Sequence, residues 1–556
     1  MHYQSFNDRM LKKLQNLTWQ YAGYIYHAEQ TFSEVLGYET KEHHRQAPDV
    51  EYFPVKDGYV WGGEFGNLWV KFDYTVPAEL DGKELFVLQN TELREGLLFV
   101  DGKPMGMYGT IIKEYDGLQH NILLTQKAEA GKTYHIDLEC YAWHDEREVH
   151  PYAREENLPD EHYRHTFHNV YVATCNWEIK NFVRDLRIFL SMAQIEQNPF
   201  MKARAINVLE RVFAEAVLPP TMVDYETVIA GVRRCNEIMA EMFTGQTCGD
   251  AYGKVGIVGH SHMDTAWLWP IAETMRKCAR TFANALVLMD QYADYKFIQS
   301  SVLHTYWMED KYPAIFEDIK KRQAEGRFEV NGGAWVECDC NITGGEYMVR
   351  QFLKGQKYLQ EKFGITNDSF WLPDTFGYNA AIPQIMRGCG MKYFYTTKLS
   401  WNEHNKFPFE TFRWVGIDGS EVITHFNITH CEPAPHLLMN HVSALQDKTS
   451  DESRLVAFGY GDGGGGPTDV MVEEATRVMQ INGLPKVEYQ TISEFGQEME
   501  KNYDKMPVYN GELYLELHRG TLTQRHQTKR NNRLCENALR NMELMAVMTG
   551  AEYNAE

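Results

Sequence analysis

The sequence has no surplus of positive charge and no long apolar run. Its 556 residues include 55 Lys and Arg against 77 Asp and Glu, a formal net charge of −22. Because neutralising phosphates requires an excess of Lys and Arg, this balance argues against a nucleic acid or an anionic membrane surface as a partner. No apolar run approaches the roughly 18 residues that span a bilayer. We therefore expect neither nucleic-acid nor membrane binding.

Sequence patterns typical of exported proteins and of proteins with structural zinc sites are also absent. The N-terminus, MHYQSFNDRMLKKLQNLTWQ, lacks the apolar region of a signal peptide. The ten cysteines form no CxxC pairs, and the CDC at Cys338–Cys340 has no second cluster at zinc-knuckle spacing. This argues against structural zinc and a disulfide framework, and it favours free buried thiols in a reducing compartment. We expect a soluble, cytoplasmic globular protein.

Two common catalytic motifs are missing as well. No G-x-S-x-G or HExxH segment occurs, which argues against serine-hydrolase and zincin chemistry. In contrast, hydrophobic residues make up 44% and aromatic residues 13% of the chain, enough to build large cores. A disordered or fibrous chain is thereby excluded, and the length predicts about three or four structural units.

The pattern of apolar and turn-forming residues changes several times along the sequence. These changes predict a multidomain α/β plus β fold. Short alternating runs such as LWVKFDYTVP and TYHIDLEC, separated by Gly, Asp and Pro, are typical of a β-sandwich or jelly roll. Stretches before and after it have helical periodicity. The predicted division is an N-terminal helical segment at 1–50, a jelly-roll-like β-sandwich at 51–150, a helical linker region at 151–250, a βα unit at 251–505 and the start of a helical bundle at 506–556.

From Lys254 short apolar strands alternate with amphipathic helical stretches. KVGIV, KFIQ, RFEV, SFWL, KYFYT, EVITHF and RLVAF are the strands. Regular βα alternation implies a parallel sheet, either a barrel or an open sheet. In both arrangements the working residues lie at the carboxyl ends of the strands. Candidate residues are therefore the polar ones directly after each strand: His260 to Asp264, Ser300 and Ser301, Asn331 to Asp339, Asp374, Lys398 and Asp462.

The strongest local signal is His260-Ser-His262-Met-Asp264, directly after KVGIV. Alternate residues of an extended segment share a face, so His260, His262 and Asp264 can point the same way. Imidazole and carboxylate at this spacing suit a zinc-like divalent cation. Hydrogen-bonded strand-end histidines are the alternative. Trp267 and Trp269 follow, either as packing residues or as an apolar platform for a sugar ring.

Two aspartates follow other strands. Asp374 comes after SFWL, where Pro373 ends the strand and Gly377 permits a tight turn. It is either a helix cap or, if it converges with His262 and Asp264, a third metal ligand or a nucleophile. Asp462 precedes four consecutive glycines, which suggest a loop lying close to a ligand, although a surface turn remains an alternative. Its carboxylate would suit a general acid.

Weaker signals complete the set. Trp335, Glu337 and Asp339 lie in NGGAWVECDCN, where core packing explains the tryptophan equally well and the carboxylates suit a supporting or substrate-hydroxyl role. Glu516 and His518 in GELYLELHRGT alternate along one face, as they would also do in a structural hairpin.

Six segments, taken in order, resemble glycoside hydrolase family 38. They are GHSHMDTAWLWP, VNGGAWVECDCN, WLPDTFGYNAAIPQI, YTTKLSWN, GYGDGGGGPT and ELYLELHRGT. The chain looks most like the cytosolic or vacuolar α-mannosidase branch of that family and its bacterial relatives, from about residue 50 to the end. The resemblance implies a central parallel (β/α)7-type barrel and a retaining exo-α-mannosidase that takes terminal mannose from oligosaccharides. It also implies a catalytic Zn²⁺, for which Co²⁺ can substitute.

The same resemblance implies roles for individual residues. His262 and Asp264 match the family's metal ligands, and Asp374 matches the nucleophile, which also binds the metal. Asp462 is the candidate acid/base. The expected substrate contacts are Trp267, which would stack under the mannose ring, Lys398, near the nucleophile, and Trp335 and Phe376. A retaining mechanism needs two carboxyl groups about 5 Å apart, one attacking and one protonating.

One family feature has no counterpart here. The family's fourth metal ligand is a histidine in an N-Q-F-H-D-like segment beyond the barrel, and no such segment occurs before the final TGAEYNAE. We therefore expect a chain truncated before the bundle and the C-terminal β-domains, with His518, His526 or water as substitute ligands.

Two other functions fit parts of the sequence. Amidohydrolase-type barrels also place HxH after their first strand, and His425 is the one further match to that alternative. A non-enzymatic glycan-binding or scaffolding role would suit a truncated chain. A homo-oligomer is a further possibility that the sequence leaves open.

Overall fold

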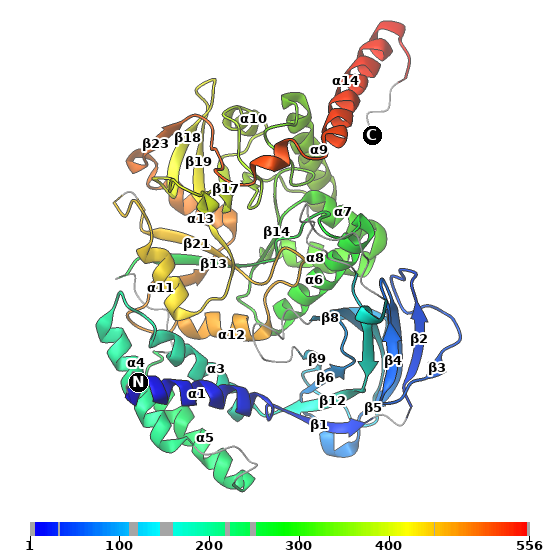
Figure 1. Cartoon of the computed structure of the whole chain (residues 1–556), viewed down its shortest axis with the longest axis vertical. Helices are drawn as coiled ribbons and strands as arrows, with labels where there is room; N and C mark the ends of the chain where they lie inside the picture. The colour runs from blue at the N-terminus through cyan, green and yellow to red at the C-terminus, as the bar shows by residue number, and fades with distance from the viewer. Residues whose placement is uncertain are drawn as a thin grey trace.

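The computed structural model describes residues 6–31, 34–109, 121–144, 160–216, 223–244, 252–449 and 451–552. Figure 1 shows three neighbouring parts: a β-sandwich, a group of helices beside it, and an α/β part above both. A last helix, α14 (His526–Thr549), projects from the α/β part.

The β-sandwich consists of a four-stranded and a six-stranded antiparallel sheet. The first has the order β1-β12-β6-β9 and the second β3-β2-β5-β10-β7-β8. Alternate residues of β10 point to opposite faces: Leu138 enters the sandwich core, whereas Glu139 faces outward toward the α/β part. The strands are β1 (Tyr26–Thr31), β2 (Leu36–Thr40), β3 (Phe53–Pro54), β5 (Asn67–Thr75), β6 (Leu85–Asn90), β7 (Glu95–Val100), β8 (Lys103–Gly109), β9 (Ile122–Thr125), β10 (Thr133–Tyr141) and β12 (Asn169–Cys175), with a separate pair, β4 (Tyr59–Gly62) and β11 (Arg164–Phe167).

The helical prediction for the first 50 residues is correct for α1 (Phe6–Ala22) but wrong for the two segments after that helix. β1 pairs with β12 and β2 pairs with β5, so both segments belong to the sandwich sheets. Pairing with strands far along the chain decides the conformation of these two segments. Local periodicity in the sequence carries no information on such pairing. The five-part division itself stays a prediction.

Three helices come after the sandwich where helical patterning predicts them. They are α3 (Trp177–Met192), α4 (Pro199–Glu215) and α5 (Tyr225–Ala240). Asn176, Asn198 and Asp224 cap their N-termini by accepting a backbone N–H three residues on. The helices pack with α1 into the largest hydrophobic core, which continues into the α/β part.

The α/β part contains the predicted parallel strands, but their ladders form two sheets. One sheet has the order β15-β14-β13-β21-β20, with β22 also beside β13, and the other has the order β16-β17-β19-β18-β23. Strands β13, β14, β15, β21 and β20 are parallel, as are β16, β17 and β19. The strands are β13 (Lys254–His260), β14 (Phe297–Gln299), β15 (Phe328–Val330), β16 (Ser369–Trp371), β17 (Tyr393–Thr396), β18 (Thr411–Val415), β19 (Glu421–Phe426), β20 (Ile428–Cys431), β21 (Ser453–Phe458), β22 (Lys486–Tyr489) and β23 (Val508–Asn510).

The two sheets meet at both sides. On one side the chain passes from β19 through Asn427 directly into β20, and thus from one sheet to the other. On the other side Asn367, before β16, donates a hydrogen bond of 3.0 Å to the carbonyl oxygen of Val330 in β15. No ladder joins β15 to β16 within the described residues, so a closed barrel stays a prediction.

Helices cover the two sheets. They are α6 (Ile271–Gln291), α7 (Val302–Lys311), α8 (Pro313–Ala324), α9 (Gly345–Phe363), α10 (Ile382–Gly388), α11 (Pro435–Ser443), α12 (Asp469–Val478) and α13 (Ile492–Glu500). Of these, α6 lies between the α/β part and the sandwich (Figure 1).

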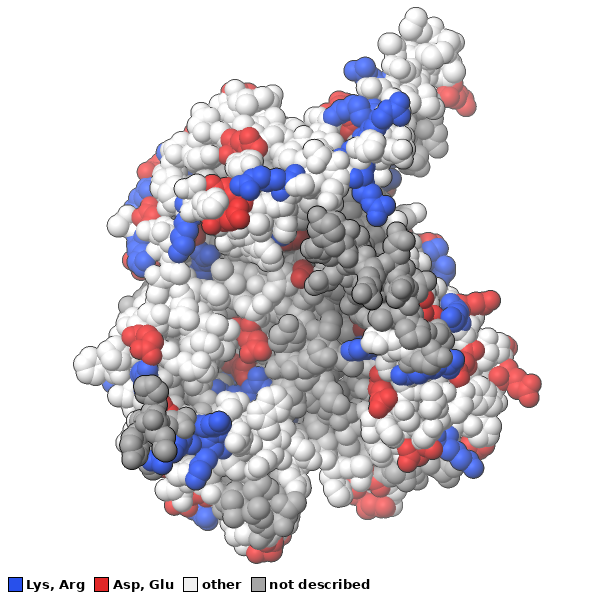
Figure 2. All heavy atoms as spheres, in the orientation of Figure 1, with Lys and Arg blue, Asp and Glu red and all other residues white. Residues whose placement is uncertain are grey.

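Helix α14 carries an exposed apolar face, and Glu536 is its buried residue. Arg350 of α9 forms an ion pair with Glu543, which anchors part of α14. None of the helices among the described residues, α14 included, has an apolar stretch of the length that a membrane span needs. Figure 2 shows acidic and basic side chains interspersed over the face drawn.

A buried ion cluster joins the helical group to the α/β part. Lys180 of α3 donates to Asp469 and Glu473 of α12 at 2.8 and 2.9 Å, and its side chain is 6% exposed. Desolvation disfavours the buried ammonium, but the two carboxylates outweigh it and raise the pKa of Lys180 well above its usual range.

We predict that Lys180→Met lowers the free energy of unfolding by about 3–5 kcal/mol, because the buried ammonium that pairs with both carboxylates is removed. Urea unfolding followed by tryptophan fluorescence measures the change. The matched control is Lys202→Met, which removes a surface ion pair with Glu196 and should cost no more than about 1 kcal/mol. Equal losses in the two variants would contradict the role given to the buried cluster.

Candidate active site

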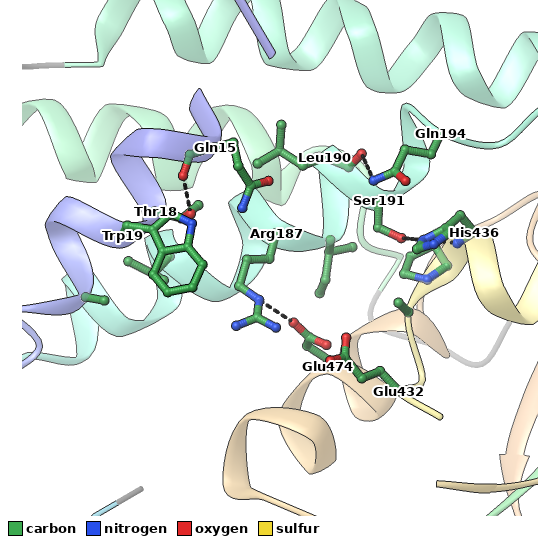
Figure 3. A pocket seen from close by; sticks show the side chains of 15 residues that line it. Gln15, Thr18, Trp19, Arg187, Leu190, Ser191, Gln194, Glu432, His436 and Glu474 are labelled. Carbon is green, nitrogen blue, oxygen red and sulfur yellow. Dashed lines mark hydrogen bonds and ion pairs between the residues drawn. The ribbon is translucent and has the colours of Figure 1, made fainter. Parts of the chain in front are cut away.

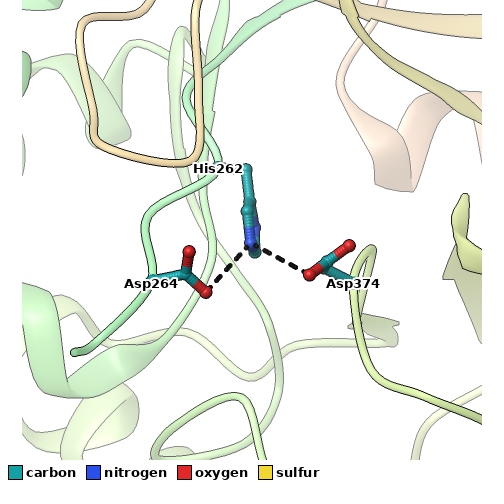
Figure 4. Close-up of side chains that lie close together, drawn as sticks. All are labelled: His262, Asp264 and Asp374. Atoms are coloured by element: carbon teal, nitrogen blue, oxygen red, sulfur yellow. Dashed lines mark ion pairs between the residues drawn. The ribbon is translucent and has the colours of Figure 1, made fainter. Parts of the chain in front are cut away.

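The loops after β13 and β16 bring His262, Asp264 and Asp374 together (Figure 4). The Nε2 atom of His262 lies 3.6 Å from Oδ1 of Asp264 and 4.0 Å from Oδ2 of Asp374. One ligand atom from each residue lies within 4.8 Å of the other two. The strands that carry these loops are in different sheets, so the fold brings together residues more than one hundred positions apart.

The ring of His262 has no hydrogen-bond partner although it is buried. Its side chain is 1% exposed, and neither ring nitrogen has a partner within hydrogen-bond distance. Asp264 and Asp374 keep 30% and 29% of their side chains exposed, so the cluster is open on the carboxylate side. A buried imidazole without partners, facing two carboxylates, is the donor set that a zinc-like cation prefers. These residues therefore fit a divalent metal.

Glu337 adds a third carboxylate. Its Oε1 lies 3.6 Å from Nδ1 of His262 and accepts a hydrogen bond of 2.8 Å from the Ser300 hydroxyl. Ser301 accepts the backbone N–H of Glu337 at 3.0 Å. Burial acts to lower the pKa of His262, but Glu337 and Asp264 outweigh it and raise that pKa well above its usual range. The site thus carries a surplus of negative charge.

Lys398 lies beside Asp374. It follows β17 in a short 3₁₀ turn (η3, Lys398–Trp401), and its Nζ donates to Oδ1 of Asp374 at 2.7 Å. The ammonium also lies over the rings of Phe376 and Trp401, 4.6 and 4.2 Å from their centroids. The lysine is 3% exposed, so its ammonium is a buried cation in direct contact with Asp374.

Asp462 lies at the edge of this cluster, in the glycine-rich loop after β21. Its carboxylate is 61% exposed and lies 3.6 Å from Nε2 of His430, whose ring centroid is 5.8 Å from that of His262. The backbone carbonyl of Asp462 accepts the N–H of Asp264 at 3.3 Å, so the two loops are joined. Asp462 has a φ of 63°, a conformation that aspartate tolerates better than most residues.

The remaining predicted residues differ in their positions. Trp267 is 61% exposed beside Trp269, and Phe376 packs against His518 with ring centroids 4.7 Å apart. Trp335 instead contacts Tyr306 and Tyr358 on helices α7 and α9, as core packing predicts.

Three further histidines and two weak carboxylate candidates lie elsewhere. His260 donates to the carbonyl of Ile298, and His526 is exposed at the start of α14. Both ring nitrogens of His425 have partners inside the sheet, the hydroxyl of Thr411 and the N–H of Leu455. His425 therefore does not join the cluster, which removes the match to an amidohydrolase. Asp339 accepts hydrogen bonds within its own loop, from the N–H groups of residues 341 and 342. Glu516 accepts from the N–H groups of residues 404 and 405 in another loop.

Sequence reasoning missed two residues around the site. His430 follows EVITHF within NITH, and only the crossing from β19 to β20 places its ring beside Asp462. His304 lies inside α7 and contacts the hydroxyl of Thr265 at 3.2 Å, next to Asp264. A lone histidine in a helix carries no sequence signal of such a contact.

A separate cavity lies between α1, α3 and the segment before α11 (Figure 3). Its volume is about 180 Å³, and its lining includes Trp19, Arg187, His436 and Glu474. Arg187 pairs with Glu474 at 3.2 Å, and His436 contacts the Ser191 hydroxyl at 2.8 Å. None of the cluster residues lines this cavity, so we assign it no part in the chemistry.

Comparison with known families identifies the two larger parts. Residues 252–512 match the model described as "Glycosyl hydrolases family 38 N-terminal domain", so this part of the chain belongs to glycosyl hydrolase family 38. Residues 30–167 match "Alpha-mannosidase, jelly roll domain". The predicted family is therefore confirmed: the chain combines the family 38 N-terminal domain with the jelly-roll domain of α-mannosidases.

Individual relatives carry the same names. The chain is 33% identical to α-mannosidase G of Dictyostelium discoideum over 512 residues, which cover 90% of this chain and 45% of that protein. It is 32% identical to human α-mannosidase 2C1 over 512 residues, 90% of this chain and 47% of that protein. The chain thus spans about half the length of these curated relatives. A crystal structure of an α-mannosidase from Enterococcus faecalis V583 aligns with a TM-score of 0.41 at 18% identity, over 47% of this chain and 31% of that one.

We predict that the metal-free protein binds one divalent cation, with Zn²⁺ as the probe, and that Asp264→Asn weakens binding by more than about 100-fold, since one of the three candidate ligands is lost. Glu337→Gln, which neutralises the carboxylate 3.6 Å from Nδ1 of His262, should cost about 10- to 100-fold. Isothermal titration calorimetry measures both. Asp418→Asn, in a surface turn, is the matched control and should bind normally. Unchanged affinity in Asp264→Asn would contradict the assigned site.

Proposed function

We propose that the protein is a retaining exo-α-mannosidase that hydrolyses terminal α-linked mannose from oligosaccharides. The observation that carries this proposal is the convergence of His262, Asp264 and Asp374 at the ends of two strands, within a family 38 domain. Mannose-containing oligosaccharides are the proposed substrates, because the relatives are named α-mannosidases.

Asp374 is the proposed nucleophile. Its carboxylate attacks the anomeric carbon while the bond to the leaving oxygen breaks, which gives a covalent mannosyl-aspartate. The neighbouring ammonium of Lys398 donates to the carboxylate and would fix its orientation. Water then attacks the anomeric carbon and releases Asp374, so the product retains its configuration.

Asp462 is the proposed acid/base. It protonates the leaving oxygen in the first step and accepts a proton from the attacking water in the second. The exposed position of its carboxylate suits a group that must exchange protons with solvent. His430, 3.6 Å away, orients it.

His262, Asp264 and Asp374 would hold a divalent metal, for which we propose Zn²⁺, with Co²⁺ as a substitute. When bound, the metal supplies a charge that can orient adjacent sugar hydroxyls. Glu337, whose carboxylate lies 3.6 Å from Nδ1 of His262, would orient the ring, as a carboxylate behind a metal-binding histidine usually does. His518, His526 and water remain candidates for a further ligand.

Substrate contacts and context complete the proposal. The exposed ring of Trp267 would stack against the mannose ring, and Lys398 and Phe376 are further proposed contacts. Trp335 stays a proposed substrate contact, although its ring packs against helices α7 and α9. We also propose a (β/α)7-type barrel, a cytoplasmic location and a possible homo-oligomer.

The test is turnover of an aryl α-mannoside by the zinc-loaded protein. We predict that Asp374→Ala lowers kcat/KM by at least about 10⁴-fold, because the nucleophile is lost. A chelator should abolish turnover and added zinc should restore it, whereas Asp418→Ala should behave as the unaltered protein. Chelator-insensitive turnover, or full activity in Asp374→Ala, would contradict the mechanism. Mannose binding without any turnover would instead favour a glycan-binding role.

A further inference from the structure

Six charged side chains are buried together where the jelly-roll sandwich meets α6. Three are carboxylates, of which two come from the sandwich, and three are cations of α6. Each side chain is at most 6% exposed, and the charges balance. The members are Glu95 (β7), Glu139 (β10), Glu273, Arg276, Lys277 and Arg280.

The contacts within this six-residue cluster are short. Lys277 and Arg280 donate to the two oxygens of Glu95 at 2.5 and 2.6 Å. Arg276 donates to Glu139 at 2.6 Å and to Glu273 at 2.9 Å. Burial opposes ionisation of Glu273, but Arg276, Arg280 and Lys277 outweigh it and lower its pKa to about 2. The carboxylates of the sandwich are therefore matched to the cations of α6 and hold that helix in one position.

A second set of α6 residues, on a stripe next to the charged one, contacts the loop that carries Asp462. The Thr281 hydroxyl accepts the N–H of Gly465 at 3.0 Å, and Asn284 donates to the carbonyl of Pro467 at 2.9 Å. Gly464 has a φ of +89°, and a Cβ on it would lie 2.8 Å from the Thr281 oxygen. The glycine-rich loop therefore lies directly against α6, and no larger residue would permit this approach.

Lys277 contacts both the sandwich carboxylate and the residues next to the glycine-rich loop. Its Nζ pairs with Glu95, lies 4.7 Å from the ring centroid of Trp269, and would lie 3.5 Å from a Cβ on Gly463. Gly463 follows Asp462, and Trp269 belongs to the segment after Asp264. Spacings of four and three residues put Lys277, Thr281 and Asn284 on one stripe of the helix.

We infer that Glu95 of the jelly-roll module is a positioning residue for Asp462, acting through Lys277 and α6 on the glycine-rich loop. This inference rests on the proposed function, in which Asp462 protonates the leaving oxygen. Neutralising Glu95 leaves a buried cation unmatched, so α6 and the loop against it shift. A displacement of about 1 Å in a reacting group can cost 10²-fold in rate. The jelly roll is then part of the catalytic apparatus without touching the substrate.

The experiment compares two substrates in the full-length, zinc-loaded Glu95→Gln variant. Phenyl α-mannoside needs protonation of its leaving oxygen, whereas 2,4-dinitrophenyl α-mannoside leaves almost without it. We expect kcat/KM to fall by at least about 10-fold on the phenyl substrate and by less than about 3-fold on the dinitrophenyl substrate. A general loss of structure would lower both values equally.

Two further variants keep the test decisive. Thr281→Val removes the hydroxyl that binds Gly465 without touching any charge, and it should give the same substrate-dependent loss, even if Glu95→Gln does not fold. Glu410→Gln is the matched control, because it removes a largely buried carboxylate, 3.8 Å from Arg454, outside the contacts of this loop. Its kcat/KM should change equally on both substrates or not at all.

The outcomes separate the positioning role from the proposed function. If the unaltered protein hydrolyses both mannosides, but kcat/KM of Glu95→Gln and Thr281→Val falls equally on both substrates or on neither, the positioning role is wrong and the function stands. If the zinc-loaded unaltered protein hydrolyses neither mannoside, the proposed function is wrong and the inference falls with it.

Discussion

Crowding of negative charge around one buried histidine is the constraint on which the rest of the site depends. His262 faces Asp264 and Asp374 on one side and Glu337 on the other, yet neither ring nitrogen has a hydrogen-bond partner. Such an arrangement is costly without a cation, because buried polar groups must be satisfied and like charges repel. Lys398 neutralises part of the charge at Asp374 alone. A divalent ion at the carboxylate side would satisfy the remaining groups together.

The fold meets this constraint by using strand ends from both sheets. Asp264, Asp374, Lys398 and Asp462 each follow a parallel strand, so short loops suffice to bring them to one edge. The loops are then fixed from behind. Helix α6 holds the glycine-rich loop, and the sandwich holds α6 through buried carboxylates. Charge is thus matched at the boundary with the jelly roll, and a divalent ion would match it at the site.

Much of the site could be predicted from local sequence. His262 and Asp264 alternate after an apolar strand, and Asp374 and Asp462 follow later strands, so position alone made them candidates. His430 could not be found this way, because its contact with Asp462 depends on the chain crossing between sheets after β19. The same limit explains β1 and β2: their partners, β12 and β5, are distant in sequence, and pairing overrides local periodicity. Trp335 is the opposite case: it also lies near a strand end, yet its ring packs against Tyr306 of helix α7.

The central claim is that the cluster of His262, Asp264 and Asp374 holds the catalytic metal. Anomalous scattering at the zinc edge, from crystals of the zinc-loaded protein, tests it most directly. The account predicts one strong peak about 2.0–2.2 Å from a nitrogen of His262 and from oxygens of both aspartates. A peak at another set of residues, or none within bonding distance of these three, would contradict it.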